Sequence, residues 1–158
     1  MCFHKEATAK ELLAKHYDKV ILSTGAHSFM PPIKGIEHAK ESLAYLEGKA
    51  QPGKHVVVIG GGLVGCETAC FMAEKAEDVT IVEMLPDILK IADHCKNNDQ
   101  ALRAMIDEKH IQKVCGVKVT EIKEDGIIYQ DDQANLHTLP CDTVIIASGF
   151  RSNNQLIK

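Results

Sequence analysis

Aromatic residues, long apolar runs and an excess of either charge are all scarce in this sequence. Aromatic residues make up 4% of its 158 residues and tryptophan is absent, which argues against a platform that stacks bases or sugars. Eighteen lysines and arginines against 22 aspartates and glutamates give a formal net charge of −4, so neither a nucleic-acid footprint nor a polybasic membrane anchor is expected. The apolar runs at residues 56–59 and 144–147 are too short to cross a bilayer. Small molecules are therefore the expected partners, rather than nucleic acid or a membrane.

Signals for secretion, disulfides and metal binding are also missing. Residues 1–6 contain no apolar signal-peptide core, and the six cysteines include no C-x-x-C pair. The histidines and cysteines follow no recognised metal-ligand spacing, so no metal site is expected. We therefore expect a cytoplasmic protein with reduced thiols.

The sequence does contain an ordinary globular composition and a regular order of predicted elements. With 45% hydrophobic residues, the chain is large enough to bury a core. Sequence periodicity predicts helices at residues 8–15, 40–46, 63–75 and 99–110. Buried strands are predicted at 18–24, 55–59, 79–82, 111–114 and 141–147, and a meander of short strands at 117–122, 126–130 and 136–139. This order predicts an α/β fold, a Rossmann-like parallel sheet with helices on both faces and an antiparallel meander crossover.

Two segments of the chain resemble each other. Residues 17–26 and 141–150 align so that Asp18 matches Asp142 and Gly25 matches Gly149. Each is a predicted buried strand that ends in small residues and then glycine, which lets the backbone approach a ligand at the carboxyl end of a sheet. The pair indicates two related units, although any two buried strands before a turn can look alike.

A glycine fingerprint follows the predicted strand at 55–59. Residues 60–65 fit G-x-G-x-x-G at the start of a predicted helix, which is the context that makes this pattern informative. Gly60 permits a tight turn, Gly62 lets a pyrophosphate approach the backbone, and Gly65 allows the helix to pack near the strand. Leu63 and Val64 then open the helix, whose unpaired N–H groups and positive dipole end favour phosphate.

An acidic residue at the end of the next strand is the expected companion of this fingerprint, and Glu83 supplies it. Its carboxylate is expected to accept hydrogen bonds from the adenosine ribose hydroxyls. Residues 84–86 provide no cation for the extra phosphate of NADPH, and the next lysine is Lys90, so NADH is favoured. The alternative is a glycine-rich turn that holds no ligand.

Glu67 lies in the first turn of the fingerprint helix and has two possible roles. It can be a surface carboxylate that complements the helix N-terminus. It can also act near the nicotinamide or an adjoining flavin.

The segment 53–69, together with residues 23–26, 31–35, 82–84 and 142–153, resembles the NADH-binding region of flavoproteins that contain two dinucleotide-binding domains. More closely, it resembles the carboxyl-terminal part of the 2-enoate reductases and 2,4-dienoyl-CoA reductases, which are related to old yellow enzyme. In that family NADH reduces FAD on a neighbouring domain, and electrons pass through an iron–sulfur cluster to FMN, where an activated C=C bond is reduced.

The resemblance also implies roles for individual residues. NAD(H) would be held by Gly60, Gly62, Gly65 and Glu83, with no catalytic side chain in this chain. The remaining matches are Thr24 and Gly25, at the exit of the flavin domain toward FAD, and Ala147, Ser148 and Gly149, at the corresponding exit of the NADH domain.

The resemblance divides the chain into three parts. Residues 1–50 would be a fragment of the FAD domain with a connector, residues 51–150 the NAD(H)-binding domain, and residues 151–158 the return to the FAD domain. Only one glycine fingerprint is present, and the cysteine cluster of an iron–sulfur site and the length for an FMN barrel are missing. We therefore expect a piece of a larger flavoprotein whose isolated form turns over nothing. The alternatives are an NADH oxidase or disulfide reductase, and a non-catalytic nucleotide sensor.

Overall fold

The computed structural model describes residues 3–90 and 96–157, and the chain forms two compact units. The larger unit contains residues Ser28–Gly149, and the smaller unit combines Met1–His27 with Phe150–Lys158. Residues 28–50, which the sequence interpretation groups with the FAD fragment and connector, lie in the larger unit. The assignment of either unit to a cofactor stays a prediction.

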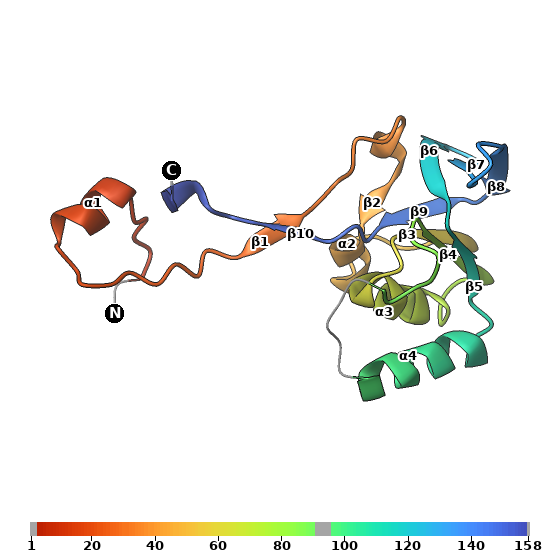
Figure 1. Ribbon diagram of the computed structural model, residues 1–158, viewed down its shortest axis with the longest axis horizontal. Helices are drawn as coiled ribbons and strands as arrows, with labels where there is room; N and C mark the ends of the chain where they lie inside the picture. Colours follow the sequence, from red (N-terminus) through yellow and green to blue (C-terminus); the bar gives the residue numbers. More distant parts are fainter. Residues whose placement is uncertain (1–2, 91–95, 158) are drawn as a thin grey trace. The chain divides into compact units, whose positions relative to one another are not determined.

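A five-stranded parallel sheet is the centre of the larger unit (Figure 1). Its strands, in spatial order, are β2 (Lys40–Glu41), β9 (Thr143–Ile146), β3 (His55–Ile59), β4 (Asp78–Glu83) and β5 (Gln112–Cys115). In the central strand, Val57 lies opposite Thr80 of β4 and Val144 of β9. Strands with this many consecutive β-branched residues are favoured where both faces of a sheet are covered. The predicted strands at 55–59, 79–82, 111–114 and 141–147 are thereby confirmed, with small shifts at their ends.

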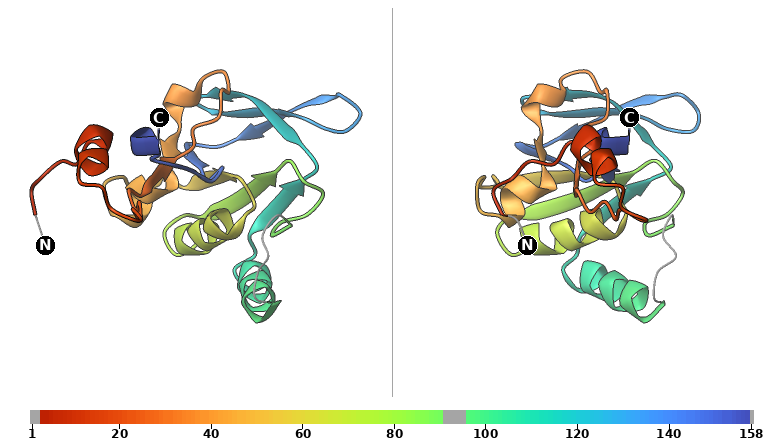
Figure 2. Two further views of the ribbon diagram at one scale, coloured as in Figure 1. Left: turned by 60° about the vertical axis from the view of Figure 1, so that its left-hand side comes forward. Right: turned by 90° about the vertical axis from the view of Figure 1, so that its left-hand side faces the viewer.

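Three α-helices cover one face of this sheet (Figures 1 and 2). They are α2 (Ser42–Leu46), α3 (Leu63–Met72) and α4 (Lys96–Glu108). Alternate strand residues such as Val58 and Ile145 face them, and both side chains are fully buried in the same apolar cluster as Met72 and Ile106. This face carries the larger of the two core clusters.

The opposite face is covered by an antiparallel meander, and here one sequence expectation is wrong. The meander consists of β6 (Lys118–Lys123), β7 (Gly126–Gln130) and β8 (Leu136–Pro140), and its Ile122 and Ile127 pack in one cluster with Val57 and Ile146. Helices were expected on both faces, but every α-helix of this unit within residues 28–90 and 96–149 lies on the first face. The connection from β5 to β9 folds as the meander and itself supplies the second layer. The α/β class, the parallel sheet and the meander are confirmed.

The smaller unit contains the helix α1 (Ala9–Ala14), the turn η2 (Gln155–Ile157) and most of a two-stranded pair, β1 (Ala26–Ser28) with β10 (Phe150–Ser152). The helix predicted at 8–15 is confirmed. It begins at Thr8, whose hydroxyl accepts a hydrogen bond from the Glu11 N–H at 3.2 Å, while the Glu11 carboxylate accepts one from the Thr8 N–H at 3.3 Å. This reciprocal capping satisfies amides that the helix cannot pair itself.

The buried strand predicted at residues 18–24 is wrong. These residues form no strand, and all of them are exposed, with Ile21 at 93% of its full accessibility. An apolar run becomes a strand only where a neighbouring strand pairs its backbone and a second layer covers its side chains. Of the two similar segments, only 141–150 meets both conditions, as β9.

Candidate functional site

The carboxyl ends of three parallel strands bring the glycine fingerprint, Glu83 and Ala147 to one edge of the sheet. The Gly60 N–H donates to the Val82 carbonyl at 2.9 Å, and the Ala147 N–H donates to the Ile59 carbonyl at 2.9 Å. Glu83 is the last residue of β4, the strand that lies between β3 and β5. The turn after β3, the end of β4 and the exit of β9 therefore form a single cluster, as the sequence predicts.

Two glycines of the fingerprint are required by close packing within this cluster. Gly60 has φ of +113°, and a Cβ added there would lie 2.5 Å from the Ala147 carbonyl oxygen. A Cβ on Gly65, in the first turn of α3, would lie 1.8 Å from the Gly60 carbonyl oxygen. A larger residue at position 60 would clash with the exit of β9, and one at position 65 would push the helix away from the end of β3.

The third glycine, Gly62, faces open space instead. It is exposed, and no atom lies within 4 Å of the position that its Cβ would occupy. It is also the N-cap of α3 and supplies no side-chain cap. The loop is therefore closed behind and open in front, which is the shape needed for a phosphate group to touch the backbone.

The first N–H groups of α3 are not hydrogen-bonded to any residue that the structure describes. The first N–H of this helix with a recorded partner is that of Cys66, which donates to the Gly62 carbonyl at 3.0 Å. Within the described ranges, no partner is recorded for the N–H groups of Leu63, Val64 and Gly65. Free amides at the positive end of a helix favour an anion, so these residues fit the pyrophosphate of a dinucleotide.

Glu83 is buried, with 9% of its surface exposed, and its carboxylate holds the loop from behind. One oxygen accepts a hydrogen bond from the Gly61 N–H at 2.5 Å and the other from the Leu85 N–H at 2.8 Å. A carboxylate oxygen has two lone pairs, so each retains capacity for a further donor such as a ribose hydroxyl. The sequence reasoning anticipates the ribose role, which stays a prediction, but misses the bond to Gly61.

The segment 85–89 is a further part of the site that the sequence reasoning misses. Leu89 donates its N–H to the Gly61 carbonyl at 2.7 Å, and the Ile88 side chain would lie 2.9 Å from a Cβ placed on Gly61. Leu89 has φ of +58°, and no sequence motif predicts this left-handed conformation for a leucine. Only the placement of this segment directly after Glu83 could have suggested a role.

The other predicted site residues lie in different surroundings. Ser148 and Gly149 are exposed at the exit of β9, and the Gly149 carbonyl accepts a hydrogen bond from the Phe29 N–H at 2.8 Å. Thr24 and Gly25 belong to the smaller unit, where the Asn153 N–H donates to the Gly25 carbonyl at 2.9 Å. The Thr24 hydroxyl donates to the Asn153 carbonyl. The two groups of residues thus belong to different compact units.

Glu67 is exposed and lines a hollow of about 350 Å³ between α3 and α4. Phe71 and Leu102 form part of the apolar lining of the same hollow. Whether Glu67 complements the helix or approaches a cofactor stays a prediction.

Of the four cysteines that the structure describes, Cys66, Cys70 and Cys141 are buried and Cys115 is half-buried. Burial raises the pKa of the Cys66 thiol to about 12 and that of Cys141 to about 11. Cys66 donates to the Gly61 carbonyl at 3.5 Å, and the four cysteines that the structure describes form no disulfide. Because a thiol must ionise to act as a nucleophile, Cys66 and Cys141 are unsuited to disulfide exchange.

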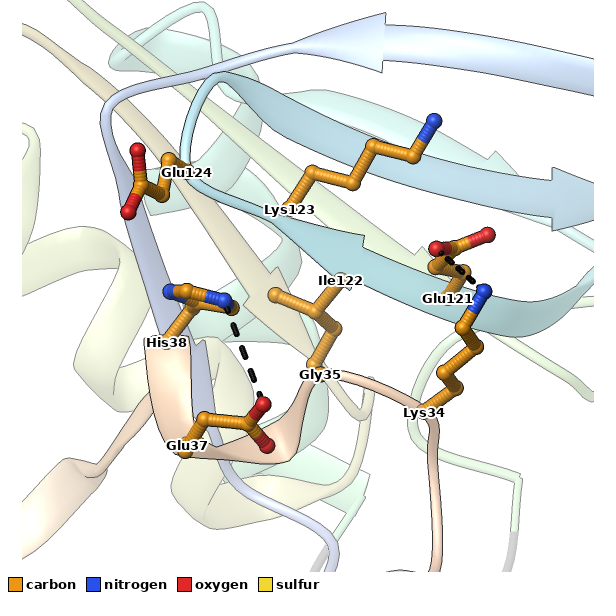
Figure 3. A pocket seen from close by; sticks show the side chains of 8 residues that line it. All are labelled: Lys34, Gly35, Glu37, His38, Glu121, Ile122, Lys123 and Glu124. Atoms are coloured by element: carbon orange, nitrogen blue, oxygen red, sulfur yellow. Dashed lines mark ion pairs between the residues drawn. The ribbon is translucent and has the colours of Figure 1, made fainter.

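A second hollow lies between residues 34–38 and the β6–β7 turn (Figure 3). Its volume is about 260 Å³, below the usual range of ligand pockets, which is roughly 300–1,000 Å³. Lys34 and Glu121 pair across it at 2.9 Å, and the hydrogen bond from Lys34 lowers the pKa of the Glu121 carboxyl. No residue of the predicted site lines it, so the glycine loop remains the candidate site.

Two further features are absent from the described ranges 3–90 and 96–157. No group of three or more histidine, cysteine, aspartate or glutamate side chains there is arranged to hold a metal ion. No helix in those ranges has the length and apolar character needed to cross a membrane.

Comparison with known proteins gives the family. Residues 2–158 match the family described as pyridine nucleotide-disulphide oxidoreductase. A bilirubin reductase from Mediterraneibacter gnavus (strain CC55_001C) is 36% identical over 151 residues, which cover 94% of this chain and 23% of the relative. An NADH oxidase from Thermoanaerobacter brockii is 37% identical over 149 residues, which cover 90% of this chain and 23% of the relative.

The fold has a close counterpart among solved structures. A 2-naphthoyl-CoA reductase in complex with 2-naphthoyl-CoA superimposes with a TM-score of 0.80 at 29% sequence identity, and the match covers 96% of this chain and 23% of that protein. The chain thus spans about a quarter of the length of the relatives that it matches.

Proposed function

Because the chain belongs to the pyridine nucleotide-disulphide oxidoreductase family, we propose that its glycine loop binds NADH and presents it to a flavin held elsewhere in a larger reductase. The observation that carries this proposal is a contrast within the fingerprint. Gly60 and Gly65 are packed against backbone atoms that leave no room for a side chain, whereas Gly62 faces open space. Such a loop has room for a ligand at one point only, directly in front of free helix amides.

The residues of the site have separable tasks in binding. The amides of Leu63, Val64 and Gly65 would hold the pyrophosphate, with Gly62 allowing its close approach. Glu83 would accept from the ribose hydroxyls and disfavour the additional phosphate of NADPH by charge repulsion. When bound, NADH supplies the hydride, and no side chain of this chain needs to act as acid or base.

The flavin is proposed to be FAD, approached by Thr24 and Gly25, whereas Ala147, Ser148 and Gly149 would form the corresponding exit of the NADH domain. That FAD would be held by the remainder of the parent flavoprotein, in the cytoplasm. An iron–sulfur cluster and FMN would complete the route in the parent protein, since the resemblance implies them and this chain has no cysteine cluster for them among its described residues.

The overall reaction proposed is reduction of a conjugated C=C bond of an enoate or dienoyl-CoA. The reductases among the relatives support it, above all the 2-naphthoyl-CoA reductase, whose ligand in its structure is an unsaturated acyl thioester. An NADH oxidase is the second candidate, favoured by the 37% identity to the Thermoanaerobacter brockii protein. A non-catalytic sensor, the third reading, would lack flavin partners altogether.

Calorimetric titration of the chain with NADH, NADPH and FAD tests the proposal. NADH should bind more tightly than NADPH, and Glu83→Ala should reduce this preference. Gly62→Ala is the sharper variant, because its backbone conformation suits alanine and its methyl group would enter only the ligand space. It should abolish NADH binding without lowering the melting temperature.

Gly48→Ala is the control for affinity alone, since it also adds a methyl group in open space outside the loop; its φ of +73° strains alanine, so a lower melting temperature is expected there. Its NADH affinity should equal that of the unaltered chain. Stoichiometric FAD binding would overturn the proposal and assign the loop to the flavin.

A further inference from the structure

Both backbone polar groups of Gly61 are hydrogen-bonded to residues outside the fingerprint turn or to the helix that follows it. Its N–H donates to Glu83, and its carbonyl accepts from the Leu89 N–H at 2.7 Å and from the Cys66 thiol at 3.5 Å. Gly62, the residue that faces the ligand space, follows directly. Any movement of Leu89 is therefore passed to the backbone that a nucleotide would touch.

The backbone conformation of the segment 87–89 depends on contacts with the rest of the protein. Leu89 has φ of +58°, a left-handed conformation that branched side chains rarely adopt and that persists only where the surroundings fix it. The Ile88 and Leu89 side chains are buried in the helical core cluster, which fixes one side of the segment. The backbone on the other side needs a separate anchor.

Arg103 of α4 provides that anchor. Its guanidinium donates to both carboxylate oxygens of Asp87, at 3.2 and 3.0 Å, and to the Ile88 carbonyl at 2.7 Å. Asp87 in turn accepts from the Ile88 N–H at 2.8 Å. A planar guanidinium can make these three bonds at once, whereas the single ammonium of lysine cannot reproduce the fork.

We propose that Arg103 is a positioning residue for the dinucleotide site, which orders the glycine loop through residues 87–89 without touching the nucleotide. The inference rests on the proposed function, because it concerns the affinity of that same loop. The path is continuous, from Arg103 to Asp87 and Ile88, then through the Leu89 N–H to Gly61.

The test compares NADH affinity in Arg103→Gln, Arg103→Lys and a control directly after the same helix. Lys109→Gln is the control, because Lys109, the residue that follows α4, also forms an ion pair, but with Glu74 at 3.1 Å rather than with the segment 85–89. The dissociation constant should rise about 3- to 30-fold in Arg103→Gln, the range for residues that couple indirectly to a site. Lysine should restore little of this loss, and Lys109→Gln should stay within about twofold of the unaltered chain.

Amide hydrogen exchange separates positioning from general stability. Exchange at Leu89 should accelerate in Arg103→Gln while exchange in β3 stays unchanged, and Lys109→Gln should alter neither. Asp87→Asn should raise the dissociation constant similarly, and the double variant should add little because both changes break one link.

The outcomes are distinguishable. An unaltered chain that binds NADH, with an Arg103→Gln variant of equal affinity and equal Leu89 exchange, overturns the positioning role alone. Accelerated exchange throughout β3 would also overturn it, since Arg103 would then act on stability as a whole. An unaltered chain that does not bind NADH defeats the proposed function and this role together.

Discussion

The two units of this protein differ in how their apolar residues are used. The larger unit has a two-sided core, with helices packed on one face of the parallel sheet and the meander on the other. In the smaller unit, none of the residues within 3–27 and 150–157 is buried. Residues 20–22 are as apolar as the middle of a core strand, yet they remain exposed. An apolar pattern therefore becomes structure only where a second layer is available to cover it.

The largest expected effect contrasts one isoleucine from each unit. Ile145→Ala removes a fully buried side chain of β9 and should lower the free energy of unfolding by about 2–5 kcal/mol. Ile21→Ala removes a side chain that is 93% exposed and should change it by less than about 0.5 kcal/mol. Urea denaturation of the chain measures both. A large loss in Ile21→Ala would mean that the smaller unit has a core after all.

A smaller effect tests the packing of the glycine loop. Gly65→Ala places a methyl group against the Gly60 carbonyl and should destabilise the chain by about 1–3 kcal/mol, as overpacking does. Thermal unfolding, followed by circular dichroism, would show the loss. Gly62→Ala is the comparison within the same motif and should unfold at the temperature of the unaltered chain. Equal melting temperatures for the two variants would contradict the close packing of Gly65.

The capped helix of the smaller unit should respond only locally. Thr8→Ala removes the acceptor for the Glu11 N–H and should weaken α1 by about 1 kcal/mol. Since α1 buries no side chain, the global unfolding of the larger unit should not change. Amide exchange would report faster exchange in residues 9–14 with no change in β3 or β4. A shift in global stability would show that the two units unfold together.

The smallest effect concerns the β7–β8 hairpin of the larger unit. A hydrogen bond with His137, at 2.7 Å, is the main cause that lowers the pKa of the Asp131 carboxyl to about 2. Because the folded pKa lies below the usual value, the ionised Asp131 stabilises the hairpin above about pH 4 and loses this effect as the pH falls through 2. His137→Gln should raise the Asp131 pKa toward its ordinary value in a carboxyl NMR titration. An unchanged pKa would mean that Asn135 and the loop amides are sufficient.

The residues that sequence reasoning located correctly share one property, which is that their signal is local. The strand at 55–59, the fingerprint and the acid at position 83 follow one another within a single β-α-β unit, and each has a short-range pattern. The segment 18–24 has the same kind of local signal, but no strand pairs with it within the described residues. The pattern alone cannot distinguish a paired strand from an unpaired one.

The residues that sequence reasoning missed depend on contacts between distant positions. No spacing rule connects Arg103 with Asp87, and a leucine gives no indication that it will adopt positive φ, as Leu89 does. The second face of the sheet is a similar case. The sequence predicts the meander, but it does not predict that the meander covers this face. These features arise when the elements pack together, and packing leaves little trace in periodicity.

Glu83 combines its proposed role in recognition with an architectural role that the structure shows. Enzyme engineers who wish to exchange one nicotinamide cofactor for the other usually begin by replacing the acid at this position. In this protein such a replacement would also release the Gly61 amide, which has no other recorded acceptor in the described part of the chain. A redesigned NADPH site would thus need a substitute acceptor for that amide before it needs a cation. Changing the preference of this loop is consequently a problem of loop repair as much as of charge.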